Sequence, residues 1–250
     1  MTDDGGVPPL PPLSAAAARL RLVLCLLTAC LAAGPARAGA PLQTEDADVL
    51  AAGDCELELA ALHLSRPRHA GGAGAGLQCG AGHRLQLGLA FARAHEEDTT
   101  SRSGQLGGKL RLGGADDGPR ASLAALVGID QDDGGRWHAA RTRVSLVGSL
   151  PAGPGTAHVN IGRYRDIPSQ LLVTTWGLAY EHGPLPIGGA GTPRWAPMVE
   201  LFGTRELGST LNLGLRGTLV EETLFLNLAL GQERRRPHTT LASAGLRWAF

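Results

Sequence analysis

Apolar and polar residues alternate along most of the chain that follows residue 54. In residues 210–219 every odd position except Gly217 is leucine, and the even positions are threonine, asparagine, glycine or arginine. Successive side chains of a β-strand point to opposite faces, so each such strand has one leucine face and one small or polar face. Sustained helical periodicity is absent. The pattern predicts about twelve antiparallel strands, at residues 55–64, 77–81, 84–94, 105–112, 120–130, 138–150, 156–165, 171–181, 196–204, 210–220, 223–232 and 239–250.

Two architectures fit strands of this kind. In a soluble sandwich the leucine faces pack on each other, whereas in a transmembrane barrel they face lipid and the polar faces line a lumen. Glycine and small polar residues on the second face favour a lumen, because water-facing strands of soluble proteins carry more lysine, glutamate and threonine. We therefore predict an all-β fold, an antiparallel transmembrane β-barrel over residues 54–250. A soluble periplasmic β-sandwich or ligand-binding barrel is the alternative.

The last strand places Leu246, Trp248 and Phe250 on one apolar face, and Phe250 ends the chain. A terminal phenylalanine behind alternating apolar residues resembles the C-terminal signature of bacterial outer-membrane β-barrels. The resemblance implies a Gram-negative outer membrane, with its lipid and lipopolysaccharide as partners. It also implies that Phe250 and Trp248 are the signal recognised by the β-barrel assembly machinery.

The first 38 residues have the features of a cleaved signal peptide. Arg19 and Arg21 precede an apolar run at residues 22–33, which is too short to span a bilayer as a helix. The cleavage rule places the cut after Ala38. Residues 1–18 are interpreted as an extension from a start site assigned too far upstream, and a lipidated Cys30 is the alternative processing product. Residues 39–53 are then expected to be a periplasmic segment ahead of the barrel.

Charge and cysteine content narrow the function. Removal of the signal peptide leaves 20 basic and 21 acidic residues, which argues against a nucleic-acid partner. Cys55 and Cys79 are the two cysteines of the exported chain, and one disulfide between them is the simplest expectation. They would lie at the same end of the first hairpin.

The polar faces carry charges that we expect to point into the lumen. Two interpretations are open: an inter-strand salt-bridge network, or a narrow ring of charge (an eyelet) with slight anion preference set by four of the bases on neighbouring strands. Those four are Lys109, Arg111, Arg141 and Arg143. The remaining inward candidates are Glu56, Glu58, Glu181, Glu200, Arg216 and Arg247.

Enzymatic and metal chemistry find little support. His138, His158 and Ser145 are of the types used in catalysis, but their settings match no nucleophile motif, and we predict no enzyme. The spacing of histidine and cysteine predicts no metal site and no cofactor. The acidic clusters at residues 96–98 and 130–133 and the arginines at residues 234–236 are expected to be solvated loops.

The start of the mature chain carries a second resemblance. Residues 41–47 include Thr44-Glu45-Asp46-Ala47, and Gly53, Cys55, Glu56 and Glu58 open the first strand. Together they are similar to the opening of outer-membrane proteins related to the phenol-degradation-pathway channel family. The resemblance implies an outer-membrane channel for small solutes. We predict porin-like passive passage, with a non-conducting structural or lipid-interacting barrel as the alternative.

Overall fold

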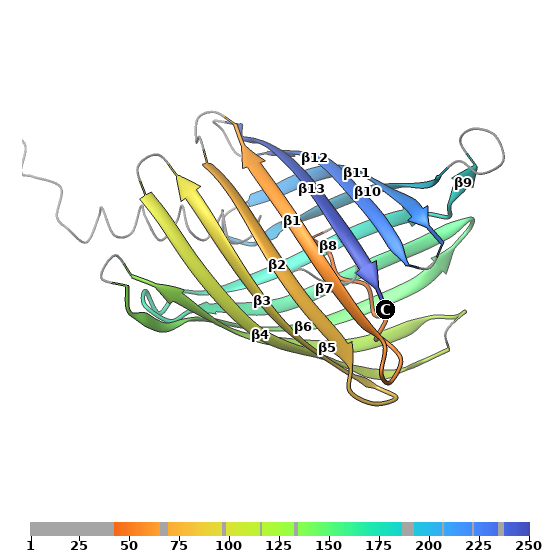
Figure 1. Ribbon diagram of the computed structural model, residues 1–250, viewed down its shortest axis with the longest axis horizontal. Coiled ribbons are helices and arrows are strands. Elements are labelled where there is room, and N and C mark those ends of the chain that lie inside the picture. The colour runs from red at the N-terminus through yellow and green to blue at the C-terminus, as the bar shows by residue number, and fades with distance from the viewer. Residues whose placement is uncertain are drawn as a thin grey trace, which may run out of the picture.

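The computed structural model describes residues 43–250 apart from residues 66–69, 97–98, 116, 133–134, 187–192, 207, 222 and 235–237. The predicted signal peptide, its cleavage site and Cys30 therefore lie outside the described residues. The strands, shown in Figure 1, are β1 (Cys55–Leu64), β2 (Ala70–Gly80), β3 (Leu85–Glu96), β4 (Thr99–Gly114), β5 (Arg120–Gln131), β6 (Trp137–Ala152), β7 (Gly155–Asp166), β8 (Leu172–His182), β9 (Leu185–Pro186), β10 (Arg194–Thr204), β11 (Gly208–Val220), β12 (Leu224–Glu233) and β13 (Thr240–Ala249).

Twelve long strands close into a barrel. Each pairs antiparallel with its neighbours in the chain, and β1 also pairs with β13, while the two-residue β9 pairs only with the start of β10. Phe250 continues the closure, because its backbone N–H and C=O bond to the C=O and N–H of Cys55 at 2.9 and 2.8 Å. Closure leaves none of these long strands with a free edge. An even strand number places both ends of the barrel sequence at one rim, which we call the terminus end; the other rim is the far end.

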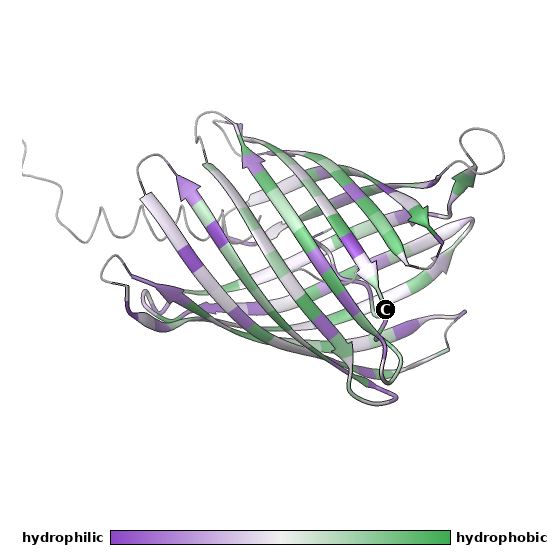
Figure 2. Cartoon of the chain, in the orientation of Figure 1, coloured by the Kyte–Doolittle hydropathy of each residue, from purple (hydrophilic) through white to green (hydrophobic). Residues whose placement is uncertain are grey.

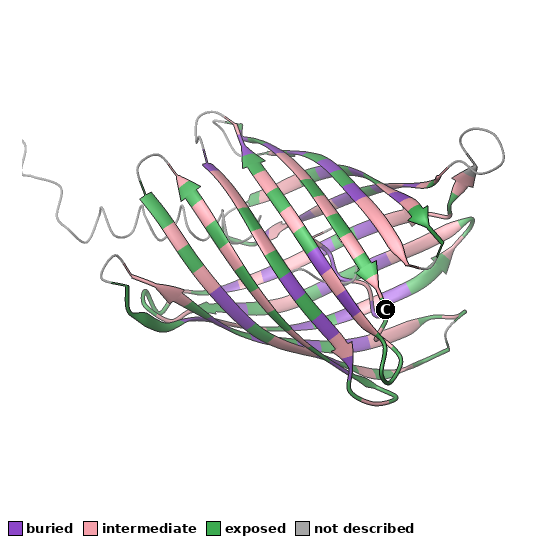
Figure 3. Cartoon of the chain, in the orientation of Figure 1, coloured by how far each residue is buried: buried purple, intermediate pink, exposed green. Residues whose placement is uncertain are grey.

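The barrel is apolar outside and polar inside. Hydrophobic and hydrophilic residues alternate along the strands (Figure 2), and so do exposed and more buried ones (Figure 3). Leu213 and Leu230 on the outer face are 58% and 64% exposed, whereas Glu58 and Asn227 on the inner face are 1% and 0% exposed. This distribution is the reverse of a soluble core and is what lipid outside a barrel requires. The prediction of a transmembrane barrel is confirmed, and the alternative of a soluble sandwich is wrong, because the leucines of a single closed sheet have no second sheet to cover them.

The strand boundaries agree with the predicted ones within a few residues, except in two strands that begin earlier. β2 begins at Ala70 rather than residue 77, and β4 begins at Thr99 rather than residue 105. Residues 70–76 are alanine and glycine, so they show no contrast between two faces. Their pairing with β1 and β3 makes them a strand.

The predicted disulfide is present. Cys55 and Cys79 are directly opposite each other in the β1–β2 register, and their sulfur atoms are bonded. The bridge joins the start of β1 to the end of β2 at the terminus end. It therefore fixes the point where the chain enters the barrel wall.

Candidate functional site

Residues 43–52 lie inside the barrel and cross its inner wall. We call them the inner belt; in Figure 1 they are the orange trace that precedes β1. Ala52 forms a parallel bridge with Gly80 at the end of β2, and Gly53, at a φ of 92°, turns the chain from the belt into β1. A positive φ of this size favours glycine. The sequence predicts a periplasmic segment at residues 39–53, but its described part from residue 43 to residue 52 folds back into the lumen.

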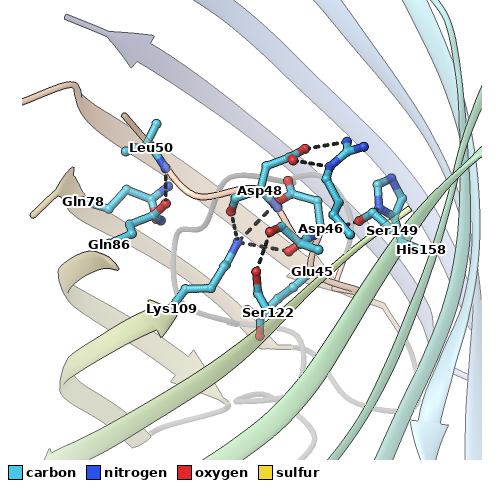
Figure 4. Close-up of polar contacts among 12 residues, drawn as sticks. Glu45, Asp46, Asp48, Leu50, Gln78, Gln86, Lys109, Ser122, Ser149 and His158 are labelled. Atoms are coloured by element: carbon cyan, nitrogen blue, oxygen red, sulfur yellow. Dashed lines mark hydrogen bonds and ion pairs between the residues drawn. The ribbon is translucent and has the colours of Figure 1, made fainter. Parts of the chain in front are cut away.

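Polar side chains of the wall hold the backbone of the belt (Figure 4). At the end of the belt nearest β2, Gln86 of β3 accepts a hydrogen bond from the Leu50 amide at 3.0 Å. Ser149 of β6 accepts one from the Ala47 amide at 2.8 Å, and Ser122 of β5 donates to the Ala47 carbonyl oxygen. A strand pairs its backbone with another backbone, whereas the belt uses side chains because it runs across the strands.

The other half of the belt is bound in the same way. Asn160 of β7, with its amide oriented to satisfy both of its partners, donates to the Glu45 carbonyl oxygen at 3.0 Å and accepts from the Glu45 amide. Glu200 of β10 accepts hydrogen bonds from the amides of Gln43, at 2.9 Å, and Thr44. A buried carboxylate thus marks the point where the described belt begins.

The belt lies close against the wall, and its length matches the strands that it crosses. A Cβ atom at Gly177 of β8 would clash with the Thr44 side chain, so glycine there makes room for the belt. Extended chain advances about 3.3–3.6 Å per residue and strands are about 4.8 Å apart, so ten residues cover roughly seven strand spacings. The belt accordingly runs from β2 to β10 with little more than one residue per strand.

Three bases of the wall bind carboxylates of the belt. Lys109 of β4 donates to the Asp46 carboxylate at 3.2 Å and to the carbonyl oxygens of Asp46 and Asp48 at 3.1 and 2.9 Å. Arg120 of β5 binds the Asp48 carboxylate through both Nε and Nη2, the bidentate geometry that gives strong charge-assisted bonds. The third pair is Arg143 of β6 with Glu45, at 3.3 Å. Neighbouring strands β4, β5 and β6 therefore present one basic surface to the belt.

The other inward arginines are paired within the wall. The three pairs are Arg141 with Asp130, Arg216 with Glu181 at 2.7 Å, and Arg247 with Glu56 at 3.5 Å. Hydrogen bonds extend the last pair, because Gln78 donates to Glu56 at 3.1 Å. These pairs fit the predicted salt-bridge network, and their carboxylates belong to strands rather than to the belt.

The four bases predicted to form an eyelet do not face one open ring. Lys109 and Arg143 bind the belt, Arg141 is paired with Asp130 toward the far end, and Arg111 donates to the Gly114 carbonyl oxygen at 3.1 Å. An eyelet with slight anion preference therefore stays a prediction about the ion selectivity of the channel.

Sequence reasoning missed Arg120, although it shares the inward parity of Ser122. It also missed the belt acids Glu45, Asp46 and Asp48, since a segment that crosses strands leaves no period-two pattern.

Space remains beside the belt at the terminus end. A cavity of about 460 Å³ is lined by Asp46 and Asp48 of the belt, Arg120 of β5, His158 of β7 and Arg216 of β11. A 12-stranded barrel is wider than the 8-stranded kind that side chains fill and narrower than the 16- to 18-stranded porins with an aqueous channel. The belt occupies part of this intermediate lumen and leaves a polar entrance.

The residues considered for catalysis have structural contacts. His158 hydrogen-bonds Ser149 at 2.8 Å, but the same hydroxyl oxygen accepts the Ala47 amide of the belt. Ser145 accepts a hydrogen bond from Arg143 at 2.9 Å, and His138 is exposed at the far rim. The described part of the chain brings together no group of three metal-ligating side chains. Among the described residues there is also no helix long and apolar enough to cross a membrane.

Acid is expected to loosen the belt through Asp46. Burial alone would raise the pKa of the Asp46 carboxyl, but Lys109, together with His158 and Arg216, outweighs it and holds the pKa below its usual value. A lowered pKa means that this contact stabilises the bound belt above about pH 4 and is lost as the pH falls through the lowered value.

We therefore expect hydrogen-exchange protection of the Asp48 amide, corrected for the intrinsic rate, to be constant from pH 8 to pH 5 and to fall below about pH 4. The control is Asp46→Asn, which cannot titrate at this position and should lose most of the pH step. An equal step in the variant would assign the effect to other carboxyls.

Comparisons with known proteins agree on the fold. The barrel is similar to the structure of the KdgM porin in complex with disordered oligogalacturonate, with a TM-score of 0.55 over 78% of this chain and 99% of that chain at 9% identity. It is also similar to the NanC porin, with a TM-score of 0.53 over 77% of this chain and 98% of that chain at 9% identity. No protein-family model matches the sequence, and neither does any curated protein. The chain thus has the closed 12-stranded fold of outer-membrane porins.

Proposed function

We propose that this protein is a porin-like passive channel for small solutes in the outer membrane of a Gram-negative bacterium. The observation that carries the proposal is the polar, charge-paired inner wall of a barrel whose outer wall is leucine. Charged side chains in a lipid-embedded protein mark an aqueous path or a paired interior. The fold that it shares with the KdgM and NanC porins supports the same reading.

The belt makes this channel narrower than the barrel alone. Its ten residues lie across the inner wall from β2 to β10, so solutes pass beside it through the cavity bordered by Asp48, Arg120 and Arg216. The resemblance of the mature N-terminus to the phenol-degradation-pathway channel family favours small molecules as solutes. Catalysis forms no part of the proposal.

The proposal includes export and assembly signals at the two ends of the chain. We infer cleavage of a signal peptide after Ala38 and recognition of Phe250 and Trp248 by the β-barrel assembly machinery. Trp248 and Phe250 are exposed on the outer face with their ring centres 5.0 Å apart. An exposed aromatic pair at the closing strand is accessible to such a partner during insertion.

The test is single-channel recording in planar bilayers with the mature protein. A heat-modifiable, folded barrel should give small, reproducible current steps that increase with salt concentration. A folded barrel that inserts and gives no steps would contradict the channel. A second candidate function is that of a structural or lipid-interacting barrel with a closed lumen. The belt favours this alternative, because the belt fills part of an already narrow interior.

A further inference from the structure

Three cations of the inner wall are paired with carboxylates of the belt. Three other cations of the wall are paired with carboxylates of strands. Lys109, Arg120 and Arg143 bind Asp46, Asp48 and Glu45, whereas Arg141, Arg216 and Arg247 bind carboxylates that belong to strands. Departure of the belt would therefore remove three negative charges from one surface on β4, β5 and β6. The rest of the wall would keep its pairs. An anion that enters the lumen would be attracted to the positive charge left on this surface.

The same surface carries the neutral groups that an oxyanion needs. Ser122 donates to the carbonyl oxygen of Ala47, and Asn160 donates to that of Glu45. These groups surround the three bases on the same strands and on β7. An anion with several oxygens that entered in place of the belt would find both charge and hydrogen-bond donors.

Every ion pair that holds the belt is a contact that such an anion can exchange. The only fully buried apolar side chain of the described belt is that of Ala47, whose one methyl group packs with Ala124 and Val147. Burial of a single methyl group stabilises the belt only slightly. The ion pairs, and the hydrogen bonds that Lys109, Ser122 and Asn160 donate, can be transferred to a competing anion. The hydrogen bonds that belt amides donate to Gln86, Ser149 and Glu200 cannot, because an anion brings no donor.

We propose that the inner surface of Lys109, Arg120 and Arg143 is a binding site for soluble polycarboxylate solutes, which the belt carboxylates Glu45, Asp46 and Asp48 occupy in the resting protein. This inference rests on the proposed function, because it assigns a class of solute to the lumen of the proposed channel. The belt acts as a ligand supplied by the chain itself, and an external polycarboxylate displaces it.

The test compares a neutral-belt variant with wild type. E45Q/D46N/D48N keeps the length and shape of the belt but removes its charges. The control, D117N/E206Q/E221Q, removes the same number of charges from exposed turns. Citrate is the probe, and its binding to folded, detergent-solubilised barrels is measured by calorimetry. If the belt occupies the site at least nine-tenths of the time, its release raises the apparent affinity for citrate about tenfold or more.

The expected result is tighter citrate binding in the neutral-belt variant and unchanged binding in the control. Addition of K109Q/R120Q/R143Q should abolish the gain. Equal citrate affinity in the neutral-belt and control variants would overturn the proposal.

Wild type gives an independent measurement if a variant does not fold. Millimolar citrate should accelerate hydrogen exchange of the Ala47 and Leu50 amides, whereas an equal ionic strength of sodium chloride should not; no difference between the salts would also overturn it. These readouts need no current, so a barrel that binds citrate without conducting would refute the channel and leave the site intact.

Discussion

Replacement of Leu89 by arginine is expected to lower the free energy of unfolding from lipid vesicles by about 2–4 kcal/mol, the cost of an arginine near the bilayer midplane on a lipid-facing strand. Leu89 lies near the middle of β3, is 47% exposed on the outer face, and is paired with Leu77 and Leu106. Lipid offers the guanidinium no hydrogen-bond partner, so the cost is that of an unpaired charge in an apolar medium.

The matched control is the adjacent position. Ala90 faces the lumen, opposite Gly76 and Gln105, so Ala90→Arg adds the same charge to a polar interior. We expect a much smaller change in unfolding free energy there, measured by urea titration of both variants in the same vesicles. Equal losses in the two variants would refute the assignment of the outer face to lipid.

Replacement of Glu200 by alanine is expected to release the first residues of the belt. The carboxylate accepts hydrogen bonds from the amides of Gln43 and Thr44 and from the side chain of Asn212, the last at 3.2 Å. A hydrogen bond to a charged group contributes about 1.5–3 kcal/mol, and 1.4 kcal/mol corresponds to a factor of ten. Hydrogen exchange of the Gln43 and Thr44 amides should therefore accelerate by about tenfold or more.

Asp130→Ala provides the comparison, because it removes an inward carboxylate that binds Arg141 toward the far end and not the belt. Its belt amides should exchange at the wild-type rate. If Glu200→Ala left the exchange of Gln43 and Thr44 unchanged, the belt would be held by its remaining contacts alone. Acceleration in both variants would mean that general loosening of the barrel, rather than loss of one anchor, exposes the belt.

The strands show why most of this fold could be predicted. The limits of β1 match the predicted residues 55–64, and the limits of β5, β7 and β8 differ from prediction by at most one residue at each end. Alternate side chains of each strand face lipid or the lumen. The sequence therefore alternates between apolar residues and small or polar residues. Where this contrast fails, as in the alanine and glycine run of β2, pairing with neighbours decides the structure.

The site shows the opposite case. Arg143 was recognised as inward from its place on a strand, but its partner Glu45 is 98 residues away and belongs to no periodic element. Arg120 was assigned to a strand without a role, because its importance comes from Asp48, 72 residues earlier. Contacts of this separation depend on how the barrel closes, and local pattern carries no information about them.

The sequence by itself determined the all-β class, the twelve long strands, the face that meets lipid, the disulfide and the inward charges, because each follows from strand periodicity or from residue type. The tertiary structure decided what those charges bind. Closure of β1 on β13 brings β4, β5 and β6 around a common interior, and the chain ahead of Gly53 turns into that interior. Carboxylates at Glu45, Asp46 and Asp48 then neutralise bases that the strand pattern alone would leave facing an open lumen.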